Sequence, residues 1–179
     1  MLRQIILAAA LTLATASFAQ AGPQYVDETG FALSGYDPVA YFEIEQVPVG
    51  TRQPEAVPGK AGITAEYNGA TWAFSSEANR DRFVANPEKY APGFDGHCAY
   101  GIAQGGKVPG NPNLWRIVDG KLYLNITPTV VGFWESDIPG SLITAGENWK
   151  TAEQNPASKQ SWKSIDDNKG TFTMSAPIK

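Results

Sequence analysis

The fold is decided first by the stretch Ile63-Thr64-Ala65-Glu66-Tyr67-Asn68-Gly69-Ala70-Thr71-Trp72-Ala73-Phe74. The Asn68-Gly69 pair at its centre tolerates the positive φ angles of a two-residue type I′ turn. The residues on both sides are rich in strand formers. This stretch therefore predicts an antiparallel β-hairpin.

A second hairpin is predicted further along the chain. The residues Leu114-Trp115-Arg116-Ile117-Val118 and Lys121-Leu122-Tyr123-Leu124-Asn125 flank the turn pair Asp119-Gly120, and large apolar residues alternate on both sides. Together the two hairpins predict one small antiparallel sheet of four strands.

Helix signals surround the two hairpins. Ser75-Ser76-Glu77 predicts a capped helix that ends at Asn86-Pro87, and Thr127-Pro128 predicts a cap followed by proline in the first turn. Ser141 is a candidate cap for a further helix. No internal repeat is visible in the sequence. Because strand-rich and helix-rich stretches are partly separated, we expect an α+β fold, with several short helices packed around the sheet.

The first 21 residues have the pattern of a secretory signal peptide. A positive start at Arg3 precedes an apolar run from Ile5 to Phe18, and Ala19-Gln20-Ala21 fits the small-residue rule for cleavage. We expect cleavage after Ala21 and a periplasmic or secreted mature protein. The expected organisation is a signal peptide over 1–21, a single α+β domain over 22–150, and a polar, loosely ordered extension over 151–179.

Charge and hydropathy exclude two classes of partner. The chain has 14 Lys and Arg residues against 18 Asp and Glu residues, a net charge of −4. No basic stripe offsets this acidity, which argues against nucleic acid as a partner. No apolar run after the leader approaches the roughly 20 residues that a membrane helix needs, so no membrane span is expected.

The candidate chemistry centres on Cys98, the only cysteine, which follows the only histidine, His97. An unpaired cysteine in an exported protein needs an explanation. A thiolate at the start of a short helix capped by Asp95 or Gly96, beside an imidazole, is a plausible ligand pair for Cu(I) or, with further ligands, zinc. Burial as an inert apolar residue and redox or disulfide chemistry are the alternatives.

Motifs for catalysis are absent from the sequence. A cysteine nucleophile needs a base from elsewhere in the chain, and no second histidine is available. Gly105-Gly106-Lys107 lacks the spacing of a phosphate-binding loop. The sequence leaves enzymatic activity uncertain and favours a non-enzymatic protein.

Several blocks resemble exported proteins of the YHS domain family, and the similarity extends roughly from Phe31 to Trp149. The blocks are Gly35-Tyr36-Asp37-Pro38-Val39-Ala40-Tyr41-Phe42, Tyr67 to Ser76, Asn86-Pro87-Glu88-Lys89-Tyr90-Ala91-Pro92, Gly96-His97-Cys98-Ala99 and Asp119 to Asn125. This resemblance implies a compact α+β module related to domains attached to copper-transporting ATPases and other metal-handling proteins.

One departure from the family pattern matters for metal binding. Metal-associated YHS modules commonly carry cysteines where this chain has Ala40 and Ser75. A metal would therefore need a different ligand set, for which we predict Cys98, His97 and Asp95, with help from the phenol of Tyr36, Tyr41 or Tyr100.

Three functions are compatible with these observations. The first is an exported, non-enzymatic binding protein with copper as the candidate metal. The second is an envelope module that binds a protein partner or a small ligand without metal. The third uses Cys98 as a reactive thiol in redox or sulfur chemistry. The sequence indicates no oligomeric state.

Overall fold

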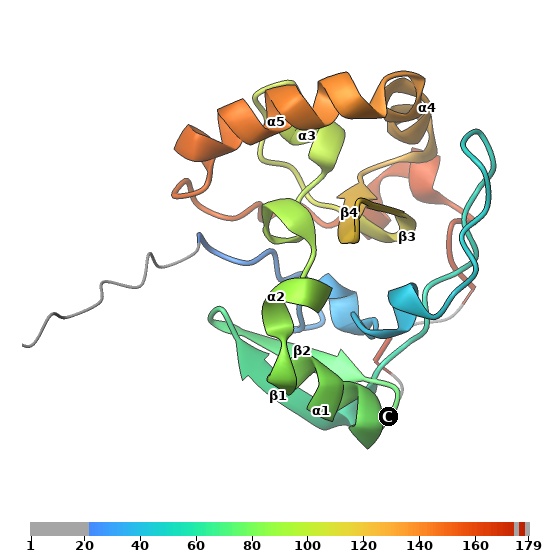
Figure 1. Ribbon diagram of the computed structural model, residues 1–179, viewed down its shortest axis with the longest axis vertical. Helices are drawn as coiled ribbons and strands as arrows, with labels where there is room; N and C mark the ends of the chain where they lie inside the picture. Colours follow the sequence, from blue (N-terminus) through green and yellow to red (C-terminus); the bar gives the residue numbers. More distant parts are fainter. Residues whose placement is uncertain (1–21, 174–175, 178–179) are drawn as a thin grey trace, which may run out of the picture.

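A computed structural model describes residues 22–173 and 176–177. The predicted signal peptide and its cleavage site therefore lie outside the described residues. The α+β fold is confirmed, with helices packed around two small antiparallel sheets (Figure 1).

The first half of the fold, residues 33–90, is a hairpin followed by two helices, and we call it unit 1. Its strands pair in register from Thr64 with Ala73 to Tyr67 with Ala70. The predicted cap is confirmed, since the side chain of Ser76 accepts a hydrogen bond from the backbone N–H of Asn79. The elements are β1 (Lys60–Tyr67), β2 (Ala70–Phe74), α1 (Glu77–Ala85) and α2 (Pro87–Tyr90).

The second half, residues 94–152, repeats this arrangement and is called unit 2. Its hairpin and helices begin 51 residues after their counterparts, as from Lys60 to Asn111. The strands and the first helix also have the same lengths in both units. The elements are α3 (Ala99–Ala103), β3 (Asn111–Val118), β4 (Lys121–Asn125), α4 (Pro128–Ser136) and α5 (Ile138–Ala152). The structure thus contains an internal repeat that is not visible in the sequence.

The repeat extends to backbone conformation at the ends of the helices. Asn86 ends α1 and caps α2 with φ −154° and ψ 72°, and Asp137 ends α4 and caps α5 with φ −154° and ψ 77°. Both side chains accept a hydrogen bond from the backbone N–H three residues later. Thr127 caps α4 as Ser76 caps α1.

The segments that enter the two units also correspond. Leu33, Ser34 and Gly35 have left-handed φ angles of 51°, 52° and 83°. The same conformation recurs at Phe94, Asp95 and Gly96, with φ angles of 54°, 50° and 77°. Each triplet ends in a backbone contact with the residue before the first strand: Gly59 donates to the carbonyl of Gly35 at 2.9 Å, and Gly110 donates to that of Gly96 at 3.1 Å.

The predicted single sheet of four strands is wrong, because the two hairpins do not pair with each other. Other segments approach the strands instead. Ala32 donates a backbone hydrogen bond to Thr71 in β2, and Cys98 forms a parallel bridge with Leu124 in β4. These short extended segments lie beside the strands where a neighbouring hairpin strand was expected.

Two further expectations need correction. The helix expected from Ser141 begins at Ile138, because Asp137 supplies the cap four residues earlier. The segment after residue 151 is not loosely attached: Trp162 is fully buried, and its indole N–H donates to Ser34 Oγ at 2.8 Å. A tryptophan buries a large apolar area, which offsets the entropy cost of ordering a polar segment.

The core joins the two units. Aromatic side chains from unit 1, including Trp72, Phe74 and Phe83, belong to the same buried cluster as Leu122 and Leu124 from β4. In the part of the chain that the structure describes, no helix is long and apolar enough to cross a membrane.

The repeat predicts that two glycines have the same steric role. A Cβ on Gly59 would lie 2.6 Å from the carbonyl carbon of Ala73, and one on Gly110 would lie 2.5 Å from the carbonyl oxygen of Gly96. We expect Gly59→Ala and Gly110→Ala each to lower the free energy of unfolding by about 1–3 kcal/mol through overpacking, as measured by urea denaturation.

The matched control is Gly146→Ala in α5, where a Cβ would meet no atom within 4 Å. Higher helix propensity should raise its stability by up to about 1 kcal/mol. Equal effects at all three positions would contradict the assigned role.

Candidate functional site

Cys98 is buried and serves as the cap of a short helix. Its side chain is 0% exposed, and Sγ accepts a hydrogen bond from the backbone N–H of Gly101 at 3.2 Å. The thiol also faces Asn125 Oδ1 at 3.5 Å. Burial raises the pKa of Cys98 to about 11, although backbone hydrogen bonds such as that from Gly101 oppose the shift, so this environment disfavours the thiolate expected from the sequence.

His97 is also buried, and both of its ring nitrogens have partners. Nδ1 lies 3.0 Å from the carbonyl oxygen of Phe94, and Nε2 lies 3.3 Å from the backbone nitrogen of Ser158. A carbonyl can only accept and an N–H can only donate, so this pattern assigns the neutral tautomer with the proton on Nδ1. Burial lowers the pKa of His97 to about 4.

Asp95 does not complete a metal site with these two residues. Its Oδ1 lies 3.5 Å from Asn68 Nδ2, and its buried Oδ2 has no hydrogen-bond partner among the described residues. Burial raises the pKa of this carboxyl to about 6. Successive residues in extended backbone point in opposite directions, and His97 and Cys98 accordingly have different polar partners.

Over residues 22–173 and 176–177, no three His, Cys, Asp or Glu side chains gather into a group that could hold a metal ion. The three candidate phenols have other partners. Tyr41 donates to the carbonyl of Pro112, Tyr36 accepts from the side chain of Asn113, and Tyr100 stacks on Phe133. The sequence predicted a ligand set that the fold does not bring together in this conformation.

Asp37 is a buried polar residue whose importance the sequence analysis missed. One carboxylate oxygen accepts hydrogen bonds from Ser75 N, Ser75 Oγ and Asn79 Nδ2, at 2.6–2.8 Å. The other accepts from the backbone N–H groups of Val39 and Ala40. Asp37 therefore ties the entry segment to the start of α1 at the two positions, Ala40 and Ser75, where metal-associated relatives were expected to carry cysteines.

The repeat places Cys98 at the position in unit 2 that is equivalent to that of Asp37 in unit 1. The backbone N–H of Asp37 donates to Val57, and that of Cys98 donates to Val108, which lies 51 residues after Val57. Cys98 therefore occupies in unit 2 the place of Asp37 in unit 1, and in both places the side chain accepts backbone N–H groups of the following turn. This correspondence favours the structural explanation for the lone cysteine.

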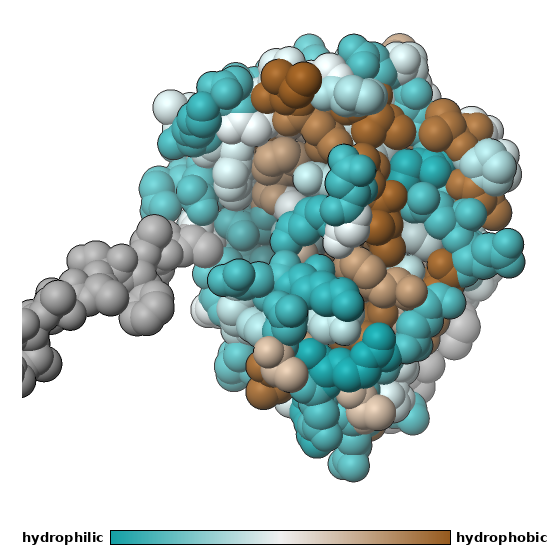
Figure 2. Space-filling model, in the orientation of Figure 1, coloured by the Kyte–Doolittle hydropathy of each residue, from teal (hydrophilic) through white to brown (hydrophobic). Residues whose placement is uncertain are grey.

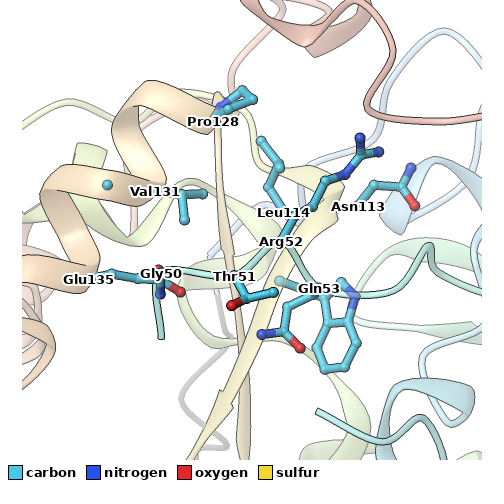
Figure 3. Close-up of a pocket in the computed structure, with 11 residues that line it drawn as sticks. Gly50, Thr51, Arg52, Gln53, Asn113, Leu114, Pro128, Val131 and Glu135 are labelled. Atoms are coloured by element: carbon cyan, nitrogen blue, oxygen red, sulfur yellow. The ribbon is translucent and has the colours of Figure 1, made fainter. Parts of the chain in front are cut away.

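The structure also contains a cavity that no sequence motif indicated. Its volume is about 210 Å³, and its walls come from the loop residues 50–53, the β3 residues 113–115 and one face of α4. Figure 3 shows Pro128 and Val131 of α4 on one side, with Leu114 and the loop opposite. The lining is mainly apolar, with a few polar groups, as in small-molecule sites.

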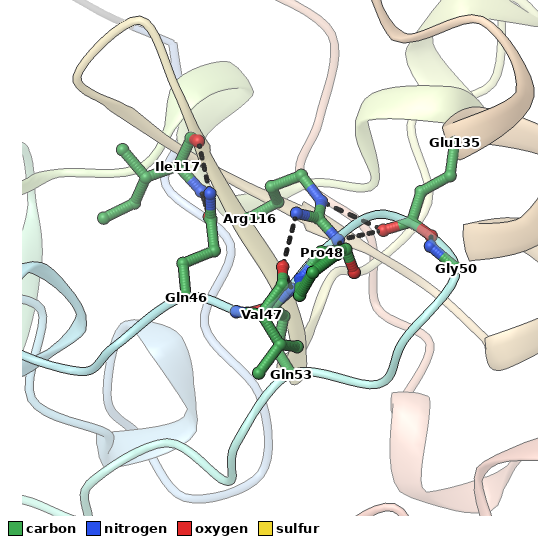
Figure 4. Close-up of polar contacts among 8 residues, drawn as sticks. All are labelled: Gln46, Val47, Pro48, Gly50, Gln53, Arg116, Ile117 and Glu135. Atoms are coloured by element: carbon green, nitrogen blue, oxygen red, sulfur yellow. Dashed lines mark hydrogen bonds and ion pairs between the residues drawn. The ribbon is translucent and has the colours of Figure 1, made fainter.

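A buried ion pair holds the loop over this cavity. The side chains of Arg116 and Glu135 are 5% and 8% exposed, and Arg116 Nε lies 2.9 Å from Glu135 Oε1. Arg116 also donates to the carbonyls of Val47 and Pro48, while Glu135 accepts from the backbone N–H of Gly50 (Figure 4). One ion pair between β3 and α4 thus fixes three backbone groups of the loop.

The side chain of Gln46 attaches the start of the same loop to β3. Its Oε1 accepts from the backbone N–H of Ile117 at 2.7 Å, and its Nε2 donates to the carbonyl of the same residue (Figure 4). The carboxamide therefore pairs with the strand edge much as a peptide group would.

Comparison with known families agrees with the unit structure. The model of the YHS domain family matches residues 54–93, which include β1, β2, α1 and α2 of unit 1. Residues 54–93 therefore match the YHS domain, which supports the resemblance noted in the sequence. No curated protein and no solved structure gives a significant match.

The shifted pKa values of His97 and Asp95 predict opposite pH dependences of the free energy of unfolding. The pKa of His97 falls from 6.5 to about 4 on folding, so the stability from its neutral form is complete above pH 6.5 and is lost as the pH falls towards 4. The pKa of Asp95 rises from 3.8 to about 6, so its contribution is complete below pH 3.8 and is lost as the pH rises through 6.

We therefore expect His97→Gln to flatten the loss of unfolding free energy between pH 6.5 and 4 relative to the unmodified protein. Asp95→Asn should make that loss steeper, because it removes the opposing contribution. Urea denaturation across this range measures both slopes. Parallel curves for all three proteins would refute the assigned environments.

The buried ion pair predicts a non-additive mutant cycle. Arg116→Met leaves the Glu135 carboxylate buried without its cation, and we expect a loss of about 3–5 kcal/mol in the free energy of unfolding. The double variant Arg116→Met/Glu135→Leu buries no unpaired charge and should be more stable than the single variant. Urea denaturation measures the cycle; additive losses would show that the two side chains act independently.

Proposed function

We propose that this chain is an exported, non-enzymatic binding protein that takes a small organic molecule into the cavity between α4 and residues 50–53. The observation that supports this most directly is the cavity itself, walled by Leu114, Trp115 and Val131. A buried ion pair fixes the covering loop, so little conformational entropy would be lost when a ligand binds.

The chemistry of the only thiol and imidazole in the chain supports a role without catalysis. At neutral pH, Cys98, with a pKa of about 11, is a buried thiol rather than a thiolate nucleophile. His97, with a pKa of about 4, has both nitrogens engaged and is poorly placed to act as a general base. These features weigh against a redox or sulfur-transfer enzyme that uses Cys98.

The cavity can be filled by one substitution that meets no obstacle. Gly132 lines the cavity, and a Cβ there would have no atom within 4 Å. We expect a library of small amphipathic molecules, screened by chemical-shift changes in NMR spectra, to yield ligands whose binding Gly132→Leu abolishes.

The control Gly146→Leu also replaces an unobstructed helical glycine, but it lies in α5 outside the cavity. It should bind the same molecules as the unmodified protein. Ligands that bind Gly132→Leu and the unmodified protein equally would refute the proposal.

Copper is the second candidate ligand, and it is supported by the family, since YHS domains are associated with metal binding. Binding through Cys98, His97 and Asp95 would require Ser158 to leave His97 Nε2 and the thiol to become accessible. A competition titration with a chromophoric Cu(I) chelator should then give one equivalent bound and none in Cys98→Ser. Unchanged binding by Cys98→Ser would remove this residue from any copper site.

Export is also part of the proposal, and it is supported by the sequence of residues 1–21. Mass spectrometry of the mature protein is expected to give an N-terminus at Gly22. An intact N-terminus at Met1 in the purified native protein would contradict export by a cleaved leader.

A further inference from the structure

The two units differ in one insertion, and the insertion covers the cavity. Tyr36 forms a bridge with Pro58, and His97 forms the equivalent bridge with Pro109. The connection between the bridged residues is ten residues longer in unit 1, and it includes the loop 46–53 that Arg116 and Glu135 hold. In Figure 1 this loop extends from unit 1 to the side of α4.

The equivalent helices sit differently on their hairpins. Helix α1 packs on both strands of its hairpin, whereas α4 packs most on α3 and, within its hairpin, mainly on β4. The space left between α4 and β3 is the cavity, which the loop residues 50–53 close from outside.

Helices α1 and α4 also differ in the residues at the positions that line the cavity in unit 2. Cavity positions 128, 131, 132 and 135 of α4 correspond to Glu77, Arg80, Asp81 and Val84 of α1. The three charged residues of α1 are thus replaced by proline, valine and glycine in α4. At the fourth position, the valine of α1 is replaced by Glu135, whose carboxylate binds the loop. Figure 2 shows mostly hydrophilic surface around unit 1 and more apolar surface around α4 and α5.

Among the side chains that line the cavity, Arg52 favours an anionic ligand. Both polar atoms of the Gln53 and Asn113 carboxamides already have partners within the protein, and Glu135 is neutralised by Arg116. Arg52 Nη1 donates to the carbonyl of Gly170, while among the described residues its Nε and Nη2 make no hydrogen bond. A guanidinium with two free donors suits a carboxylate.

From these observations we infer that unit 2 is a diverged copy of the YHS unit and is the ligand-binding copy, which takes a small carboxylate with an aromatic or branched apolar body. The apolar body lies against Leu114, Trp115 and Val131, and the carboxylate faces Arg52 at the rim. This inference rests on the proposed function and adds the chemical class of its ligand.

Benzoate, benzamide and benzamidine test the ligand class, because they share a shape and differ in charge. We expect benzoate to bind most tightly and benzamidine most weakly in titrations followed by NMR. Arg52→Gln should weaken benzoate binding about tenfold or more, since a charge-assisted hydrogen bond is lost. The affinity for benzamide should be unchanged, and Gly132→Leu should abolish binding of both.

The outcomes separate this inference from the proposed function. Equal affinities for benzoate and benzamide, both lost in Gly132→Leu, would overturn the carboxylate class and leave the cavity as a binding site. Benzoate binding that Arg52→Gln does not change would overturn the role of Arg52 and with it the inference. Failure of all three compounds to bind would also overturn the class, while the library screen with Gly132→Leu judges the cavity independently.

Discussion

The ion pair of Arg116 and Glu135 joins three parts of the chain through one buried set of polar contacts. It connects the hairpin of unit 2 to α4, and through Val47, Pro48 and Gly50 it connects both to the longest loop of unit 1. Burying a pair of charges costs desolvation energy that a well-packed apolar pair would not incur. The pair nevertheless fixes several backbone groups in one geometry, which apolar side chains cannot do. The shape of the cavity depends on that geometry.

Repetition of backbone structure without visible repetition of sequence is the second main feature of the molecule. What recurs is the set of positions where the backbone has special requirements: turn pairs with positive φ, side-chain caps, and glycines at close approaches. Different residues satisfy each requirement, as with Ser76 and Thr127, or Asn86 and Asp137. Sequence identity between the units is therefore low even where the chain path is the same.

The local structure followed well from the sequence because it depends on near neighbours. Asn68-Gly69 and Asp119-Gly120 have the positive φ angles expected of their turns, and the helices after Ser76 and Thr127 begin where predicted. Arrangements that depend on distant residues did not follow. The hairpins were expected to pair with each other, the tail was expected to be loose, and the environments of Cys98 and His97 depend on Asn125 and Ser158, far away in the sequence. The ion pair of Arg116 and Glu135 likewise could not be predicted, because the sequence does not show that these two charged residues lie close together.

The buried Trp162 has a consequence for the order in which the protein can fold during synthesis. This residue lies near the end of the chain, yet it donates to Ser34 near the start of the described structure and is fully buried. Ser158, just before it, contacts His97 in unit 2. A nascent chain that has not yet reached residue 162 lacks a large core side chain and the contact that joins its two ends. The packed state is thus completed only when nearly all of the chain has been made, although each hairpin has its own local turn signals much earlier.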